Sequence, residues 1–209
     1  MTAQLLESPV SFDDFIEWLP ETSECRYELH RGRIVEMPKP KGKHSQVAGY
    51  IALKAGIEIE RLSHPWFVPK ECIVQSIAGD SAYEPDVIVL DEPALAEEPR
   101  WESGSIITLG KSIKLIVEVV STNWRDDYLT KLGEYEALGI PEYWIVDYAA
   151  FGGRLHIGNP KQPTLSVYSL VEGEYEVQRF QSGEYLHSPT FSGLNLFVEK
   201  IFEAGKEPE

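Results

Sequence analysis

The chain has 209 residues, of which 43% are apolar and 25% are charged, so it is long and apolar enough to form one domain with a sizeable core. This composition excludes a disordered or repetitive chain. The formal net charge of −15 at pH 7 excludes strong non-specific attraction to nucleic acid through bulk charge, because phosphate binding needs basic surface.

The ends and the cysteines of the chain give no sign of export or of a metal cluster. The first residues, MTAQLLESPVSFDDF, contain no basic segment followed by an apolar one, and no apolar run is long enough to cross a membrane. We therefore expect a cytoplasmic protein with no membrane partner. Cys25 and Cys72 have no metal-type spacing and do not imply a disulfide.

The N-terminal third predicts a helix, a hairpin and a second helix. Residues 11–20 (SFDDFIEWLP) form a short helix that Ser11 can cap. Residues 27–37 (YELHRGRIVEM) read as a β-hairpin that turns at its Arg-Gly pair. Residues 43–62 predict a long amphipathic helix, since apolar residues recur there at helical spacing.

The middle of the chain predicts strands that alternate with one helix. Two strand fragments are expected within residues 66–76, and a further strand at 86–90 is followed by a loop. Residues 112–121 (SIKLIVEVVS) predict the central strand. A helix over 123–141 should end at its Gly and Pro, and EYWIVD at 142–147 predicts another strand.

The last third predicts mainly strands. We expect strands with turns at 152–158 (GGRLHIG) and 165–180, and a short helix near 197–204.

The order of these elements predicts a single α/β (α+β) domain over residues 1–209, with a core of about 11–150 and a β-rich C-terminal part of about 151–209. A mixed sheet should carry its acids on adjacent strands.

Glu118 is the residue that most needs an explanation, because aliphatic residues surround it in LIVEVVS. On a half-exposed strand Ile116 and Val120 would be polar as well, so the strand is expected to be covered on both faces. An ionised carboxylate there is costly unless it is paired or bound to a metal. A structural salt bridge and a functional site are equal alternatives for Glu118.

Three further residues fit a site around Glu118. Asp86 follows a proline at the start of an apolar strand. Lys131 shares a helix face with Tyr128 and Tyr135 and should face the sheet, although its stem could instead run along the helix edge to solvent. His44 begins the apolar face of the long helix, where a capping or core histidine is the alternative.

These residue types suit metal-assisted hydrolysis of a phosphodiester. Two carboxylates on neighbouring strands, Asp86 and Glu118, can hold Mg²⁺ or Mn²⁺, which keeps several water or phosphate ligands. Lys131 would then orient the attacking water or stabilise the charge that develops in the transition state.

The chain also resembles a known family. RYELHRGRIVEM, KHSQV, YEPDVIVLD and LIVEVVSTNWRDDYLTKLGEYEALGIPEYWIVD are similar to the Uma-two family of restriction-endonuclease-like proteins, within the PD-(D/E)xK nuclease superfamily. The similarity extends over nearly the whole chain. It implies a mixed central sheet flanked by helices, with the acids at one end of a strand pair, and a Mg²⁺-dependent DNA endonuclease.

The resemblance also bears on single residues. The superfamily's acid-x-Lys pattern would put lysine at Val120, and the resemblance moves that role to Lys131. Glu28 and His44 match further motif positions, so both join the catalytic candidates, although a hairpin glutamate such as Glu28 is commonly solvated. Asp147 is interpreted as structural.

Asp126 and Asp127 are interpreted as acids of the first helical turn, where they suit the helix dipole.

Two other functions remain open from the sequence. One is a catalytically silent nuclease fold used for binding or regulation, and the other is a metal-dependent hydrolase of a smaller phosphoester. A nuclease this acidic needs a local positive rim, so we expect the basic segments RGR (31–33) and KPKGKH (39–44) beside the site. Arg33, Lys41 and Lys43 are the candidates for contacts with DNA, and a homodimer is an alternative to a monomer.

Overall fold

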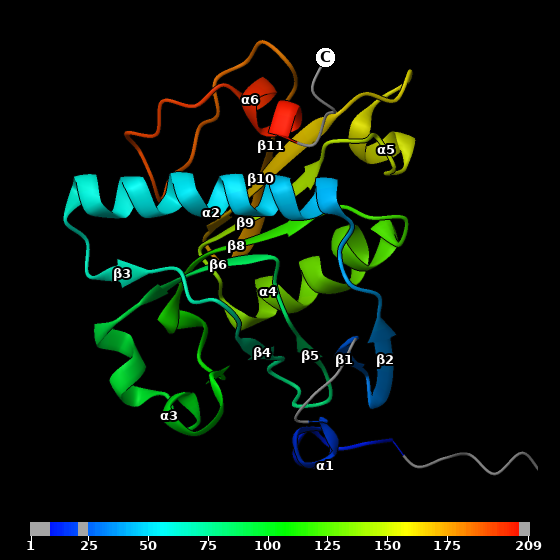
Figure 1. The fold of residues 1–209 in the computed structure, drawn as a ribbon, viewed down its shortest axis with the longest axis vertical. Helices are drawn as coiled ribbons and strands as arrows, with labels where there is room; N and C mark the ends of the chain where they lie inside the picture. The colour runs from blue at the N-terminus through cyan, green and yellow to red at the C-terminus, as the bar shows by residue number, and fades with distance from the viewer. Residues whose placement is uncertain (1–8, 21–24, 205–209) are drawn as a thin grey trace, which may run out of the picture.

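The computed structural model describes residues 9–20 and 25–204, which form two mixed sheets flanked by helices (Figure 1). The larger sheet has six strands, in the spatial order β11 (Glu174–Phe180), β10 (Thr164–Val171), β9 (Glu142–Asp147), β8 (Ile113–Val119), β6 (Val87–Asp91) and β3 (Trp66–Phe67). β8 and β9 are parallel, and their other neighbours are antiparallel. The α/β fold class is confirmed.

Both faces of β8 are covered, as its sequence predicts. Val117 and Val119 pack in one core with residues of α2 (Gly42–Leu62) and α6 (Val198–Ala204). Ile116 and Val120 pack in a second core, against the helix that follows β8. Figure 1 shows α2 crossing one face of the sheet and α4 (Leu132–Leu138) lying on the other. Glu118 has the same orientation as Ile116 and Val120, so it points toward that second helix.

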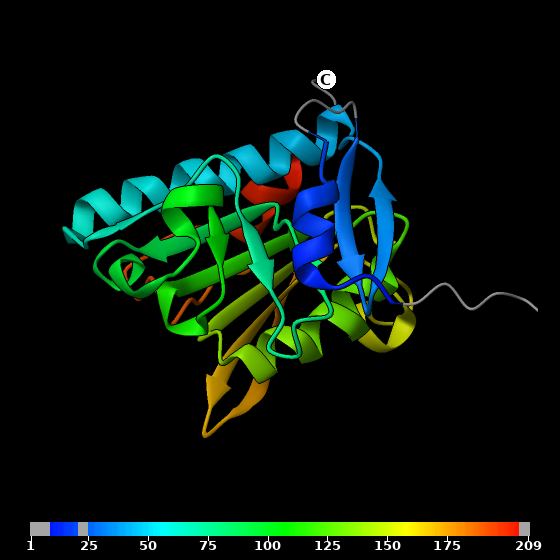
Figure 2. The ribbon, with the colours of Figure 1, turned by 90° about the horizontal axis from the view of Figure 1, so that it is seen from below.

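The smaller sheet forms around the predicted hairpin, where the sequence pattern indicated only one sheet. Its five strands are β2 (Arg33–Met37), β1 (Arg26–His30), β5 (Ala82–Tyr83), β4 (Ile73–Gln75) and β7 (Ile106–Ile107). The hairpin turns where Arg31 and Gly32 both have positive φ angles, 49° and 75°, the conformation that favours two-residue hairpin loops. Figure 2 shows this hairpin beside the N-terminal end of α2.

Helix α1 (Phe12–Trp18) closes this smaller sheet, with Phe12 and Phe15 packed against Leu29. Ser11 caps it as predicted, because its Oγ accepts a hydrogen bond from the Asp14 amide at 3.1 Å. The remaining short helical elements are η1 (Pro93–Glu97), α3 (Trp101–Gly104), η2 (Gly110–Ser112), the π-helical η3 (Asp126–Lys131) and α5 (Arg154–Ile157). Within the described residues, no helix combines the length and apolarity that a membrane span requires.

Two local predictions differ from the structure. The sequence of residues 152–158 predicts a strand, but these residues contain the single helical turn α5, because β10 already occupies the edge of β9 where such a strand would pair. That turn buries Ile157 and leaves Leu155 exposed. The helix expected over 123–141 begins as the π-helical turn η3 and becomes α-helical only at α4.

The C-terminal strands belong to the central sheet. β10 pairs with β9 from Thr164↔Asp147 to Ser169↔Glu142, and β11 continues the sheet beyond β10. The β-rich part therefore supports the strands that carry the candidate site.

Candidate active site

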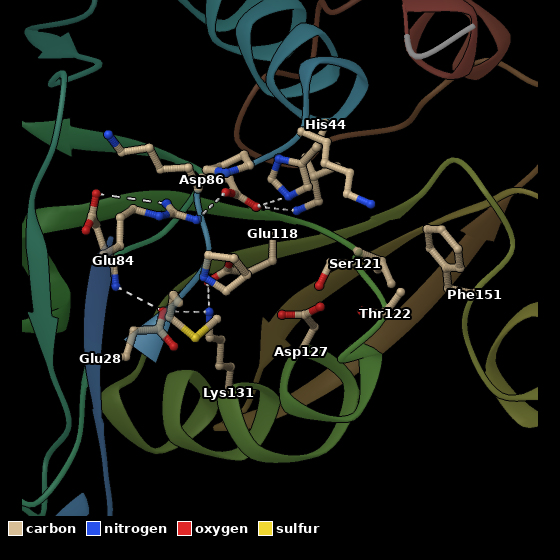
Figure 3. A pocket seen from close by; sticks show the side chains of 18 of the residues that line it. Glu28, His44, Glu84, Asp86, Glu118, Ser121, Thr122, Asp127, Lys131 and Phe151 are labelled. Carbon is tan, nitrogen blue, oxygen red and sulfur yellow. Dashed lines mark hydrogen bonds and ion pairs between the residues drawn. The ribbon is translucent and has the colours of Figure 1, made fainter. Parts of the chain in front are cut away.

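A cavity of about 230 Å³ opens at the end of the larger sheet, between the N-terminus of α2 and the turn η3 (Figure 3). Strands of both sheets and helices on both faces contribute to it. Its polar lining includes Arg26, Glu28, Lys39, Lys41, His44, Glu84, Asp86, Glu118, Ser121, Thr122, Asp127 and Lys131. All five predicted catalytic residues are in this set.

Lys131 joins two buried acids that are far apart in the sequence. Its Nζ donates to Glu118 Oε1 at 2.9 Å and to Glu28 Oε1 at 3.0 Å. Only 5% of the Lys131 side chain and 4% of each acid side chain are exposed. Glu118 is therefore paired, and the Lys131 side chain does not take the alternative path along the helix edge to solvent.

Further side chains hold the two acids in place. The Tyr135 hydroxyl donates to Glu118 Oε1 at 3.0 Å, and His30 Nε2 lies 2.8 Å from Glu28 Oε2. Tyr135 was expected only to pack on the sheet, so its hydrogen bond to Glu118 is an addition. These bonds fix one oxygen of Glu118 while its carboxylate still faces the cavity.

The surroundings of Glu28 and Glu118 shift the pKa values of these two acids in opposite directions. Burial alone would raise the pKa of Glu28, but Lys131 and His30 lower it to about 2. Burial raises the pKa of Glu118 to about 7 against the effect of Lys131, and the nearby charges of Asp86 and Glu28 add to the rise. Burial would lower the pKa of Lys131, yet the surrounding carboxylates raise it, so the ammonium stays charged.

Asp127 is an acid of the cavity that sequence reasoning missed. It does lie in the first helical turn, as expected, and so does the half-buried Asp126, which pairs with Asn123. The π-helical turn, however, directs both Asp127 and Lys131 into the cavity (Figure 3). Burial raises the pKa of Asp127 well above its usual range.

Asp86 lines the same cavity and is held by several partners. Its Oδ2 accepts a hydrogen bond from the Val119 amide at 2.8 Å and lies 3.2 Å from His44 Nε2. Arg26 lies 3.6 Å from Asp86 Oδ1 and 3.9 Å from Glu84. Burial would lower the pKa of His44, but its hydrogen bond to Asp86 raises it.

Arg26 and Glu84 are further cavity residues that the sequence did not single out. Glu84 precedes Asp86 in the motif EPD, and Arg26 precedes the YEL motif, so both lie within motifs that the sequence already marked.

The donor set fits a small divalent cation. Asp86 and Glu118 line one cavity, where burial raises the pKa of Glu118 and the nearby charges of Asp86 and Glu28 add to the rise. Across residues 9–20 and 25–204, no group of three or more His, Cys, Asp or Glu side chains is arranged to hold a metal. Mg²⁺ commonly uses one or two carboxylates and keeps waters or phosphates as its other ligands, so two acids suffice for it.

The basic segments reach the cavity only in part. Lys39 and Lys41 line it, whereas Arg33 and Lys43 are not among its lining residues. Arg33 begins β2 at the hairpin turn, and the cavity is reached only at the other end of that strand, at Met37. The expectation that RGR lies beside the site thus differs from the structure. The extended strand β2 separates Arg33, at the hairpin turn, from Met37, at the cavity.

Asp147 has a structural environment. It is fully buried and accepts hydrogen bonds from the amides of Phe151 at 2.9 Å and Gly152 at 2.7 Å. It does not line the cavity.

Comparisons with known proteins agree with this architecture. The chain aligns over 95% of its length with all of a crystal structure described as "a putative nuclease belonging to DUF820" from Anabaena variabilis ATCC 29413, with a TM-score of 0.70 and 22% identity. This likeness shows a shared fold. A search of curated proteins found no match. Residues 12–199 match the model of the Uma2 family, described as "Putative restriction endonuclease". Since this match spans most of the chain, the protein belongs to the Uma2 family of restriction-endonuclease-like proteins.

Proposed function

We propose that the protein is a metal-dependent endonuclease that hydrolyses phosphodiester bonds in DNA, with Mg²⁺ or Mn²⁺ as its cofactor. The observation that carries this proposal is the buried Lys131 ammonium, bonded to Glu118 inside the cavity that also holds Asp86. Two carboxylates that can bind a metal ion, with a lysine ammonium beside them, are suited to the hydrolysis of a phosphodiester.

Asp86 and Glu118 would hold the cation, which when bound lowers the pKa of water and neutralises phosphate oxygens. The chain itself orients these two ligands. Hydrogen bonds from Lys131 and Tyr135 fix Glu118, while the Val119 amide and His44 fix Asp86. His44 is therefore a positioning residue for Asp86.

Lys131 has the position needed to act on the reacting groups. Its ammonium faces the cavity and remains charged, so it can orient the attacking water and stabilise negative charge on the phosphate. In hydrolysis the water oxygen bonds to phosphorus, the bond to the leaving oxygen breaks, and that oxygen takes up a proton. Ser121 and Thr122 place hydroxyl groups in the same cavity as hydrogen-bond donors.

The test is a cleavage screen with plasmid and with single-stranded and duplex oligonucleotides, in Mg²⁺ and in Mn²⁺. The Asp86→Asn/Glu118→Gln double variant should lose cleavage. Asp91→Asn is a matched control, because Asp91 ends the strand β6 that Asp86 precedes and pairs with Lys114 at 2.7 Å outside the cavity. Equal cleavage by the wild type and the double variant would overturn the proposal.

A hydrolase of a smaller phosphoester is the second candidate. The acids lie inside a cavity of about 230 Å³, and the net charge of −15 weakens attraction to long nucleic acids. Hydrolysis of bis(p-nitrophenyl) phosphate with no cleavage of any nucleic acid would favour this candidate. Absence of both activities would favour a catalytically silent binding module.

A further inference from the structure

We propose that the mouth of the cavity is a binding site for an unpaired nucleobase, with Phe151 as its stacking surface, so that the substrate enters as single-stranded nucleic acid. The inference rests on the proposed nuclease function and adds the substrate class. Figure 3 shows Phe151 at the edge of the cavity beyond Thr122, on the side opposite Glu28 and Glu84.

Phe151 is an exposed ring with a rigid support. It has 38% of its surface exposed and belongs to none of the three core clusters of the described residues. Asp147 accepts a hydrogen bond from its amide at 2.9 Å, and Lys161 Nζ donates to its carbonyl oxygen at 3.1 Å. The chain thus fixes the backbone on both sides of a ring that contributes nothing to the core.

The residues on either side of Phe151 have a constrained backbone, which also packs against Asp147. Ala150 has a positive φ of 56°, an uncommon conformation for a residue with a side chain. A Cβ atom at Gly152 would lie 2.9 Å from Asp147 Oδ2, so glycine is required for the close approach that holds this turn. Such local constraint is characteristic of functional loops.

The depth of the acids disfavours a paired substrate. The acids line a cavity of about 230 Å³, and the side chains of Asp86 and Glu118 are only 7% and 4% exposed. A duplex is a stiff rod with its phosphates fixed on the outside, so bringing one of them to such buried acids requires the duplex to deform. An unpaired strand can bend one phosphate inward.

Charge leads to the same substrate class. Binding of a duplex depends on cations placed along the phosphates, and the net charge of −15 weakens the attraction of this chain for them. Stacking of a base on an aromatic ring needs no net charge and works for every base. Lys39 and Lys41 line the cavity together with Phe151, so a base and its adjacent phosphate could be bound at once.

A second cavity offers space for the rest of the strand. Glu84 lines both cavities, which therefore adjoin, and the second is lined by Trp101 and Lys70 among others. A single strand with its scissile phosphate at Asp86 and Glu118 has room to continue there.

The experiment is a binding titration of labelled oligonucleotides of one sequence, as single-stranded DNA, single-stranded RNA and duplex DNA, in EDTA so that no cleavage occurs. The wild type should bind at least one single strand about tenfold more tightly than the duplex. Phe151→Ala should weaken that binding by about tenfold, the scale expected when one stacking ring is removed. Phe151→Trp should restore it, because an aromatic ring is retained.

Leu155→Ala is the matched control, since Leu155 lies in the same connection, is 86% exposed and does not line the cavity. It should bind as the wild type does. The single-stranded DNA and RNA arms show whether the sugar is also read. Equal binding of duplex and single strands, no binding of any oligonucleotide, or unchanged binding by a folded Phe151→Ala would overturn the inference. Failure of the proposed nuclease function would instead appear as absent cleavage in Mg²⁺ with this binding pattern intact.

Discussion

Two neighbouring parallel strands, β8 and β9, each carry a buried acid near the same end of the sheet, and the two acids have different surroundings. Asp147 of β9 is bonded by main-chain amides of the loop that follows it. Glu118 of β8 is bonded by the side chains of Lys131 and Tyr135 and faces a cavity. Burial raises the pKa of both carboxyl groups.

The difference shows how one fold uses the same costly group in two ways. Main-chain amides that satisfy Asp147 shape a loop, and they leave no oxygen directed at a ligand. Side chains that satisfy Glu118 neutralise part of its charge and leave it beside open space, where a cation or a phosphate can be bound. Burial of an acid therefore indicates function only when its partners and its access to solvent are known.

The largest expected effect comes from removing the Lys131 ammonium beside Glu118. Lys131→Met should lower cleavage by at least about 100-fold, the scale seen when one preorganised donor is removed. Under the proposed function, Mg²⁺ should stabilise Lys131→Met and the wild type alike in a thermal melt, because lysine is not a metal ligand.

The control for this prediction is Lys111→Met, which removes an exposed lysine that pairs with Glu97 on the surface. Full cleavage by Lys131→Met would assign Lys131 a purely structural role, like that of the groups around Asp147.

The next largest effect concerns Glu28, the second acid bonded to Lys131, and the pH dependence of the free energy of unfolding. The pKa of Glu28 falls from 4.5 to about 2 on folding, which corresponds to about 3 kcal/mol of unfolding free energy. Because the folded-state pKa is lowered, this stability is present above pH 4.5 and is lost as the pH falls toward 2. Urea unfolding from pH 3 to 6 should show the wild type gaining stability over Glu28→Gln as the pH rises. A pH-independent difference, or the same trend in the exposed control Glu17→Gln, would contradict it.

A smaller effect should follow from Asp147→Asn. The asparagine amide can accept only on one side, so a main-chain N–H of Phe151 or Gly152 would meet another donor, and the protein should become less stable by about 1–3 kcal/mol. Cleavage at saturating substrate should stay within a few-fold of the wild type once the protein is folded. A fall in that rate comparable to the effect of Glu118→Gln would erase the distinction between the two acids.

The smallest effect is expected at the basic rim. Lys41→Glu should weaken nucleic-acid binding, and the slope of its salt dependence should fall by about 0.7 for each phosphate of a single strand that is no longer neutralised. Arg33→Glu introduces the same charge change at the hairpin turn, away from the cavity lining, and should have less effect. Equal weakening in both variants would mean that overall charge, and not the rim, governs binding.

Local sequence patterns were sufficient for most of the fold. The apolar run on both sides of Glu118 predicted a strand covered on two faces, and the spacing of apolar residues predicted α2 with His44 at its start. Helical spacing also directed Lys131 toward the sheet, and the structure brings it to Glu118. These features depend on the periodicity of a strand or a helix, which a single segment contains in full.

Other features required the tertiary structure. Asp127 looked like an ordinary acid of a first helical turn, and only the π-helical turn beside the sheet directs it into the cavity. Arg26 and Tyr135 acquire their roles from partners in other segments, and Phe151 becomes notable only because its ring stays outside the core. The sequence by itself determined that Glu118 and Lys131 would be buried, because their burial follows from local periodicity. Which groups meet them, and which side chain remains free for a ligand, was decided by contacts between distant segments, which no local pattern contains.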